Sequence, residues 1–317
     1  MGVIVTEFTL ARDARDVIEA CVIQNRTALT NARTPEEISP ILDKVWPLLP
    51  GDLRKDIEDF HSGKTDITVF RGGSAVANGE EVMPTPPRKE APGYEEQLLY
   101  APTMALFSAL MNVRPVRTAE GTIMFNHVIP DAPQAKFDVH STGRDLKMHV
   151  DSMYYREMPG VIGLFCNRGQ EGANTRFIKI DDILSELDEE TIAELRKPQF
   201  GFTEGVDLRA RAGNPFGVSR EGAPEVIDVP YSLLDGDKLR YSQDSIGLNI
   251  RAKQALEALN AAIKESKTTD INLQTGDIAF QRNDRLVHGR SPFEFTDNPA
   301  KKRWLMRMTG HYGLQAT

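Results

Sequence analysis

Apolar and polar positions alternate with different periods in the first third of the chain and in the remainder. Apolar residues recur at helical spacing over residues 10–31, and the run TPEE from Thr34 starts a second helical stretch that extends to residue 60. The segment "TDITVF" at 65–70 is rich in β-branched and aromatic residues and predicts a strand. The segment "YEEQLLYAPTMALFSALM" from Tyr94 predicts another helix, which Pro102 should kink or divide.

Short strand-like runs separated by turn residues follow Arg117. The runs are "GTIMFNHVIP", "DLKMHV", "VIGLFC", "TRFIKI", "EVIDVP", "KLRYS", "DINLQ", "DIAFQ" and "KRWLMRMTG". Helices are expected near 181–196 and 248–265, where "IRAKQALEALNAAIKE" has a 3.6-residue period. Many short strands favour a sandwich or jelly roll over a doubly wound sheet. Glycine and proline are frequent between Gly72 and Gly93, which indicates a long loop.

Length and composition fit one catalytic domain better than two. The chain has 317 residues, of which 40% are hydrophobic and 26% charged, as in ordinary globular proteins. We expect a single domain over 1–317, in which a mostly helical N-terminal layer (1–115) packs on a strand-rich core (116–317).

The charge balance and the cysteine count limit the partners and the compartment. The net charge of −8 disfavours nucleic acids and anionic membranes. No apolar run reaches the roughly 18 residues of a membrane helix. Two distant cysteines and an N-terminus without a secretory pattern indicate a reducing cytoplasm. No Gly-x-Gly-x-x-Gly follows a strand, so a dinucleotide has no obvious binding motif.

The first chemical signal is the pair His149 and Asp151 in "KMHVDSMYY". On a strand, residues two apart share a face, so the imidazole and the carboxylate are expected side by side. A second imidazole would complete the set of two histidines and one carboxylate that holds non-haem Fe(II). His288, in "LQTGDIAFQRNDRLVHGRSPFEF", is the candidate for a neighbouring strand. The pair alone is also consistent with a simple hydrogen bond.

Three blocks in order, "HVDSMYYREMPGVIGLFCNR", "GDIAFQRNDRLVHGRSPF" and "KRWLMRM", resemble the clavaminate synthase-like branch of the Fe(II)/2-oxoglutarate dioxygenases, which is related to taurine dioxygenase. The resemblance covers most of residues 120–310. It implies a mainly β protein with flanking helices and a double-stranded β-helix (jelly roll) core. It further implies that His149, Asp151 and His288 bind iron.

The same resemblance assigns the cosubstrate and part of the substrate pocket. It matches Arg303 to the arginine that binds the far carboxylate of 2-oxoglutarate, and Thr175 to a threonine that supports this contact. A guanidinium suits a carboxylate because it donates two parallel hydrogen bonds. Arg307 is matched to an arginine that binds the substrate's α-carboxylate in amino acid hydroxylases. The alternative is that Trp304, Met306 and Met308 form the buried face of this strand, with both arginines in solvent.

Other substrate contacts are less specific. Asp244 lies near where hydroxylases of basic amino acids place acidic residues, although it also fits a turn before a helix cap. Glu120 and Tyr154 are further pocket candidates. The glycine-rich stretch 205–222 is either a lid or an exposed connection. Aspartate at position 151, where clavaminate synthase and arginine hydroxylases usually have glutamate, resembles taurine dioxygenase and argues against halogenation.

The resemblance implies hydroxylation of a free amino acid or a close derivative, with a basic side chain favoured. Fe(II), 2-oxoglutarate and O₂ are the implied cofactor and cosubstrates, and succinate and CO₂ the coproducts. Desaturation and cyclisation are alternatives of the same chemistry. A zinc hydrolase with the same ligands and a non-catalytic jelly-roll binding module are alternatives of other classes.

Overall fold

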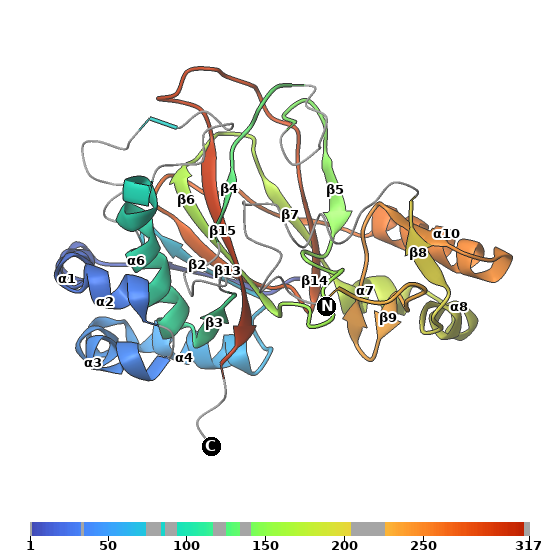
Figure 1. Cartoon of the computed structure of the whole chain (residues 1–317), viewed down its shortest axis with the longest axis horizontal. Helices are drawn as coiled ribbons and strands as arrows, with labels where there is room; N and C mark the ends of the chain where they lie inside the picture. The colour runs from blue at the N-terminus through green and yellow to red at the C-terminus, as the bar shows by residue number, and fades with distance from the viewer. Residues whose placement is uncertain are drawn as a thin grey trace.

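The computed structural model describes residues 2–32, 35–73, 84–85, 94–116, 125–133, 141–203 and 226–313. Two β-sheets of unequal size face each other at the centre, and helices flank them on either side (Figure 1). The strands are β1 Val5–Thr9, β2 Ile67–Arg71, β3 Val113–Pro115, β4 Phe125–Val128, β5 Leu146–His149, β6 Val161–Arg168, β7 Thr175–Lys179, β8 Phe200–Phe202, β9 Leu234–Asp235, β10 Lys238–Leu239, β11 Ser245–Gly247, β12 Thr269–Ile271, β13 Ile278–Arg282, β14 Leu286–Arg290 and β15 Trp304–Tyr312. The helices are α1 Arg12–Gln24, α2 Arg26–Asn31, α3 Pro35–Val45, the 3₁₀ turn η1 Trp46–Leu48, α4 Gly51–His61, α6 Tyr94–Leu110, α7 Ile180–Ser185, α8 Glu189–Leu195 and α10 Ile250–Glu265.

The larger sheet is seven-stranded, with the order β1-β2-β13-β6-β15-β3 and β4 paired with β15. The smaller sheet is four-stranded, with the order β12-β7-β14-β5. Apart from the parallel pair β1–β2, the pairings within both sheets are antiparallel. Strands β13 and β14 are joined by a short turn but belong to opposite sheets, so this turn connects the two layers.

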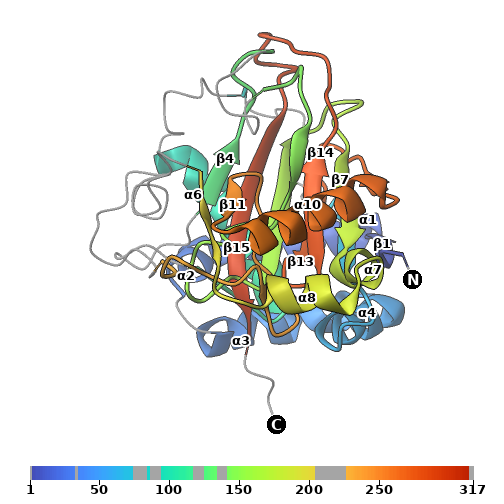
Figure 2. The same cartoon turned by 90° about the vertical axis from the view of Figure 1, so that its right-hand side faces the viewer.

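Successive side chains of a strand point to opposite faces of its sheet. Buried apolar side chains therefore form one hydrophobic core between the two sheets and one on the outer face of each sheet. Leu305 of β15 and Leu164 of β6 face the smaller sheet, where they join a buried cluster with Phe177 and Leu286. The opposite face of β15 packs against the N-terminal helices and α6. Helices α7, α8 and α10 cover the outer face of the smaller sheet, and α8 and α10 cross in front of the strands in Figure 2.

Most predicted elements are confirmed, and the differences have local causes. The helix expected at 181–196 is wrong as one element: it is α7 and α8, because Asp188 starts a new helix by accepting a hydrogen bond from the Thr191 amide at 2.7 Å. The strand expected at "EVIDVP" is wrong, since over its described residues, 226–230, only Val226 forms a bridge, an isolated one with Tyr155. Helix α6 runs through Pro102 undivided.

Strand β1 was not expected from the sequence, and it pairs with β2 at the edge of the larger sheet. The N-terminal layer therefore contributes three strands, β1, β2 and β3, to this sheet in addition to its helices. The stretch 205–222 and most of 72–93 lie outside the described residues. Among the helices described, none is both long and apolar enough to cross a membrane.

Candidate metal centre

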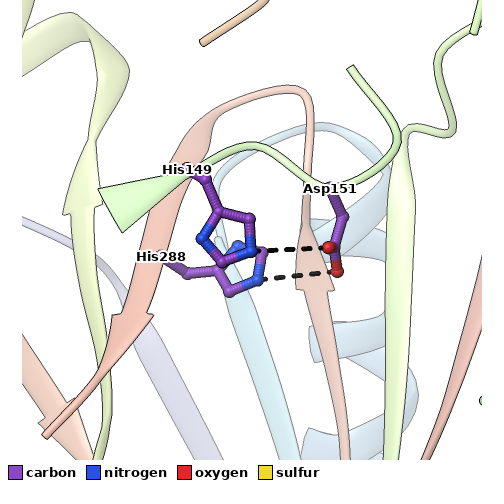
Figure 3. A group of neighbouring side chains, drawn as sticks. All are labelled: His149, Asp151 and His288. Atoms are coloured by element: carbon purple, nitrogen blue, oxygen red, sulfur yellow. Dashed lines mark ion pairs between the residues drawn. The ribbon is translucent and has the colours of Figure 1, made fainter. Parts of the chain in front are cut away.

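The side chains of His149, Asp151 and His288 converge at one point (Figure 3). Nε2 of His149 lies 3.5 Å from Oδ1 of Asp151, and Nε2 of His288 lies 3.5 Å from Oδ2. One potential ligand atom from each residue lies within 4.8 Å of the others. The two histidines are direct partners in the antiparallel pair β5–β14, which brings residues remote in sequence together.

Asp151 reaches this point differently from the expectation. The prediction that it shares a strand face with His149 is wrong, because β5 ends at His149 and Asp151 lies in the turn that follows. Its carboxylate still points back toward both imidazoles, and Asp151 is only 4% exposed. The turn, rather than the strand period, therefore sets the position of the third group.

The protonation states favour metal binding. Nδ1 of His149 is 2.8 Å from the carbonyl oxygen of Lys147 and donates a hydrogen bond to it, which leaves Nε2 as the nitrogen that faces Asp151. Burial lowers the pKa of His288 and favours the neutral imidazole. Burial alone would raise the pKa of Asp151, but nearby Arg307 and the histidines outweigh this effect and hold the pKa well below its usual value. The surroundings therefore favour a neutral imidazole at His288 and an ionised carboxylate at Asp151.

These groups fit a divalent transition metal. Oδ2 of Asp151 is buried and accepts no hydrogen bond within the described part of the chain, so a carboxylate oxygen faces the imidazoles without a donor. Imidazole nitrogen and carboxylate oxygen suit Fe(II) and zinc alike, and the set of three leaves further coordination positions open.

Arg303 precedes β15 and is buried. It is 4% exposed, and burial lowers the pKa of its guanidinium to about 10. No hydrogen bond or ion pair joins it to another described residue; its guanidinium carbon lies 5.7 Å from the ring centre of Phe293. The guanidinium carbon of Arg290, on β14, lies 4.8 Å from the centre of the same Phe293 ring. Burial of a guanidinium without an ion pair among the described residues is costly, and a bound anion would offset this cost.

Thr175 occupies the same end of the interior. It pairs with Arg290, two residues beyond His288 on β14, and is 7% exposed. Two residues along a strand span about 7 Å, so Thr175 lies near the metal centre but outside its three-residue cluster.

Arg307 lies on the face of β15 that meets the smaller sheet. The alternative is right that Trp304, Met306 and Met308 form a buried face, but it is wrong that both arginines lie in solvent, because Arg303 is buried and Arg307 is partly buried. Nη1 of Arg307 donates to Oδ1 of Asp151 at 2.6 Å, and its side chain is 24% exposed. Arg307 thus adjoins the metal centre.

The remaining candidates are more peripheral or lie outside the description. Tyr154 lies in the turn region after Asp151, with its ring 4.8 Å from that of Tyr155. Asp244 lies before β11, where its carbonyl oxygen accepts from the Thr203 amide, so it belongs to the small β8–β11 sheet. Glu120 lies outside the described residues.

Two residues that sequence reasoning missed hold the segment after His149. Asn283 contacts the backbone of Asp151, and Arg240 donates to the carbonyl oxygens of Met153, Tyr155 and Arg156. No local pattern marks either residue, since an asparagine in "QRNDR" reads as an ordinary turn residue.

Comparison with known sequences gives a family match and one curated relative. The model of the family described as "Taurine catabolism dioxygenase TauD, TfdA family" matches residues 108–309. Enduracididine beta-hydroxylase from Streptomyces hygroscopicus is 30% identical over an alignment 181 residues long, and the match covers 51% of this chain and 52% of that protein. The match thus spans about half the length of this relative.

Two solved structures share the fold over nearly their whole length. Asparagine oxygenase in complex with Fe(II), 2S,3S-3-hydroxyasparagine and succinate has a TM-score of 0.73 at 21% identity, covering 97% of this chain and 94% of that one. Non-heme iron oxygenase OrfP with Fe, succinate and (3S)-hydroxy-L-Arg has a TM-score of 0.75 at 18% identity, covering 98% and 95%. With the two facing sheets, these likenesses confirm the expected mainly β fold with a jelly-roll core and flanking helices.

Proposed function

The chain belongs to the TauD/TfdA family of taurine catabolism dioxygenases, and from this premise we propose that it is an Fe(II)- and 2-oxoglutarate-dependent oxygenase that hydroxylates a free amino acid or a close derivative. The observation that carries the proposal is the convergence of His149, Asp151 and His288 in a core that also contains the buried Arg303, which has no ion pair with another described residue. A zinc hydrolase would use the three ligands but gives no reason for Arg303.

The chain's own residues would bind the metal at one end of the interior and the cosubstrate's far carboxylate at the other. His149, Asp151 and His288 would hold the metal, while Arg303 and Thr175 would bind the far carboxylate of 2-oxoglutarate. The apolar cluster between the sheets, including Leu164, would keep water from the reacting groups. When bound, Fe(II) and 2-oxoglutarate supply the oxidising chemistry, in which O₂ gives one oxygen atom to the substrate and one to succinate, with release of CO₂.

The substrate class is proposed from Arg307 and from the relatives. A guanidinium beside Asp151 suits the α-carboxylate of an amino acid, which would place the adjacent carbons near the metal. The names of the relatives refer to enduracididine, asparagine and arginine, hydroxylated at the beta or 3 position. We therefore expect the β-carbon to be oxidised. A basic side chain is favoured, with Asp244, Glu120 and Tyr154 as proposed contacts.

The proposal includes the setting in which the protein works. A single catalytic domain over 1–317 and a cytoplasmic location fit the small-molecule substrate and the two buried thiols, Cys21 and Cys166. Desaturation or cyclisation of the same substrate class is the second candidate, because the same cofactor supports it.

Anaerobic addition of Fe(II) and 2-oxoglutarate tests the proposal directly. The expected result is a weak visible charge-transfer band that is absent in His149→Ala and His288→Ala, together with succinate release stimulated by one or more amino acids in air. No band in the folded wild-type protein would overturn the proposal and favour the hydrolase or the binding module. Screening amino acids for stimulated succinate release then identifies the substrate.

A further inference from the structure

We propose that Asn283 is a positioning residue that fixes the Asp151 carboxylate in the metal centre and thereby sets the affinity for divalent metal. The proposal rests on the metal-binding role proposed for His149, Asp151 and His288. It adds a residue outside the ligand set, in the turn between β13 and β14.

The need for such a residue follows from the end of β5. The strand ends at His149, so the backbone of Asp151 receives no hydrogen bonds from the β5–β14 ladder. One side-chain amide satisfies both of its backbone groups. Oδ1 of Asn283 accepts from the Asp151 amide at 3.0 Å, and Nδ2 donates to the Asp151 carbonyl oxygen at 3.0 Å.

The same side chain holds the far end of the segment that begins at Asp151. Nδ2 of Asn283 also donates to the carbonyl oxygen of Pro159 at 2.8 Å, and the Asn283 amide donates to that of Gly160 at 2.8 Å. Asn283 is completely buried. The two ends of the segment 151–159 therefore meet at one residue, and a shift of Asn283 moves both.

Asn283 also ties this segment to the strand that carries His288. It lies just before β14, in a turn held by the ion pair between Arg282 and Asp284 at 3.1 Å. His149 is held against His288 by the strand pair, and Asp151 is held against the start of the same strand by Asn283. All three ligands thus take their positions from β14. Metal sites tolerate displacements of only about 0.5 Å, so this tie controls affinity.

The chemistry of the amide determines the informative substitutions. Asn283→Asp keeps the shape but replaces the donor with a charged acceptor that faces two carbonyl oxygens. Asn283→Leu keeps the approximate size and removes all three side-chain hydrogen bonds. Asn167→Leu is the matched control: Asn167 is equally buried on β6, but neither atom of its amide has a hydrogen-bond partner within the described chain.

Co(II) titration of the purified full-length proteins, followed by calorimetry and by the visible absorption of the bound ion, tests the proposal. We expect both Asn283 variants to bind Co(II) about 10- to 100-fold more weakly, as for other residues that orient metal ligands. Their Co(II) absorption should change in shape, whereas Asn167→Leu should match the wild type. If Asn283→Leu does not fold, Asn283→Ser, which leaves room for water, takes its place.

The outcomes separate this proposal from the function on which it rests. Folded Asn283 variants with wild-type Co(II) affinity and absorption would overturn the positioning role, even if their melting temperatures were lower. Failure of the wild-type protein to bind Co(II) or Fe(II) would instead overturn the proposed metal centre. A purely structural role predicts lower stability with unchanged metal spectra.

Discussion

Arg307 donates a hydrogen bond of 2.6 Å to Asp151, so a cation from the larger sheet is paired with the single carboxylate of the candidate metal centre. The two residues lie 156 positions apart in sequence. The pair brings the proposed substrate-binding group into contact with a proposed metal ligand. Changes at Arg307 therefore distinguish a role in substrate binding from a role in metal binding.

Arg307→Met removes the cation and keeps a long side chain. We expect the KM for the amino acid substrate to rise about 10- to 100-fold, because a hydrogen bond between charged groups contributes about 1.5–3 kcal/mol. Co(II) affinity should not fall, since a guanidinium beside Asp151 repels a divalent cation. Succinate release against substrate concentration and a Co(II) titration measure the two effects.

Arg176→Met is the control for this change, because Arg176 lies on β7 and its guanidinium pairs with Asp145 near the surface, at 3.0 Å. Both KM and Co(II) affinity should remain at wild-type values in this variant. Weaker Co(II) binding with an unchanged KM in Arg307→Met would contradict the substrate role.

Arg303→Met should stabilise the protein and abolish its response to 2-oxoglutarate. Arg303 is a buried cation whose pKa burial lowers to about 10, and replacing it with an apolar side chain removes a desolvation cost. We expect the melting temperature to rise by roughly 2–6 °C, corresponding to about 1–2 kcal/mol. Thermal melts with and without 2-oxoglutarate and Co(II) measure both effects.

Arg303→Lys keeps the charge and should retain part of the ligand-induced stabilisation, which makes it the appropriate control. A lower melting temperature in Arg303→Met, with full stabilisation by 2-oxoglutarate, would show that Arg303 is a structural residue with a different anion site nearby.

Gly289→Ala should weaken metal binding without touching a proposed ligand. A Cβ atom at Gly289 would lie 2.5 Å from the carbonyl oxygen of Leu146 and 3.3 Å from Sδ of Met148. These atoms belong to β5, which must move away from β14 and take His149 with it. Calorimetric Co(II) titration should show a loss of about 10-fold or more, in the range seen when ligand orientation is disturbed.

Gly51→Ala is the matched glycine control, since its Cβ would meet only Nη2 of Arg54, at 3.8 Å. It should bind Co(II) like the wild-type protein. Equal affinity in Gly289→Ala and Gly51→Ala would mean that the close approach of β5 to β14 does not determine the geometry of the site.

The sequence predicts the local elements well because their signals are local. Helix α10 follows from its period, and Asn249 caps it by accepting from the Ala252 amide at 2.9 Å. Strand β1 was missed because its pairing with β2 joins residues about 60 positions apart, and no turn connects them. Pairings at such separation depend on the tertiary fold rather than on the strand's own residues.

The candidate site shows the same difference between what local sequence signals predict and what long-range contacts decide. Residue types and the ordered blocks suggested His149, Asp151, His288 and Arg303, which the fold brings into one interior. None of the three sequence blocks indicated that β5 stops before Asp151. The side-chain amide of Asn283, 132 positions away, takes the place of the strand-to-strand hydrogen bonds there. A side chain that satisfies a distant backbone leaves no periodic pattern in the sequence.

Three partly buried histidines outside the metal centre should make the metal-free protein acid-sensitive. Trp304 donates from Nε1 to Nδ1 of His127 at 2.9 Å, and burial lowers the pKa of His127 to about 4. Burial also lowers the pKa values of His61 and His311. The unfolded chain, with a histidine pKa near 6.5, binds these protons first as the pH falls. The stability contribution is therefore complete above pH 6.5 and is lost between pH 6.5 and 4.

His127→Gln isolates one part of this dependence, because the glutamine oxygen can still accept from Trp304 while the side chain no longer titrates. Each such histidine contributes at most about 1.4 kcal/mol per pH unit to the slope. Urea unfolding of the metal-free protein at several pH values should give a shallower slope for His127→Gln than for the wild type. The same slope in both proteins would mean that His127 is protonated as readily in the folded as in the unfolded chain, against the burial argument.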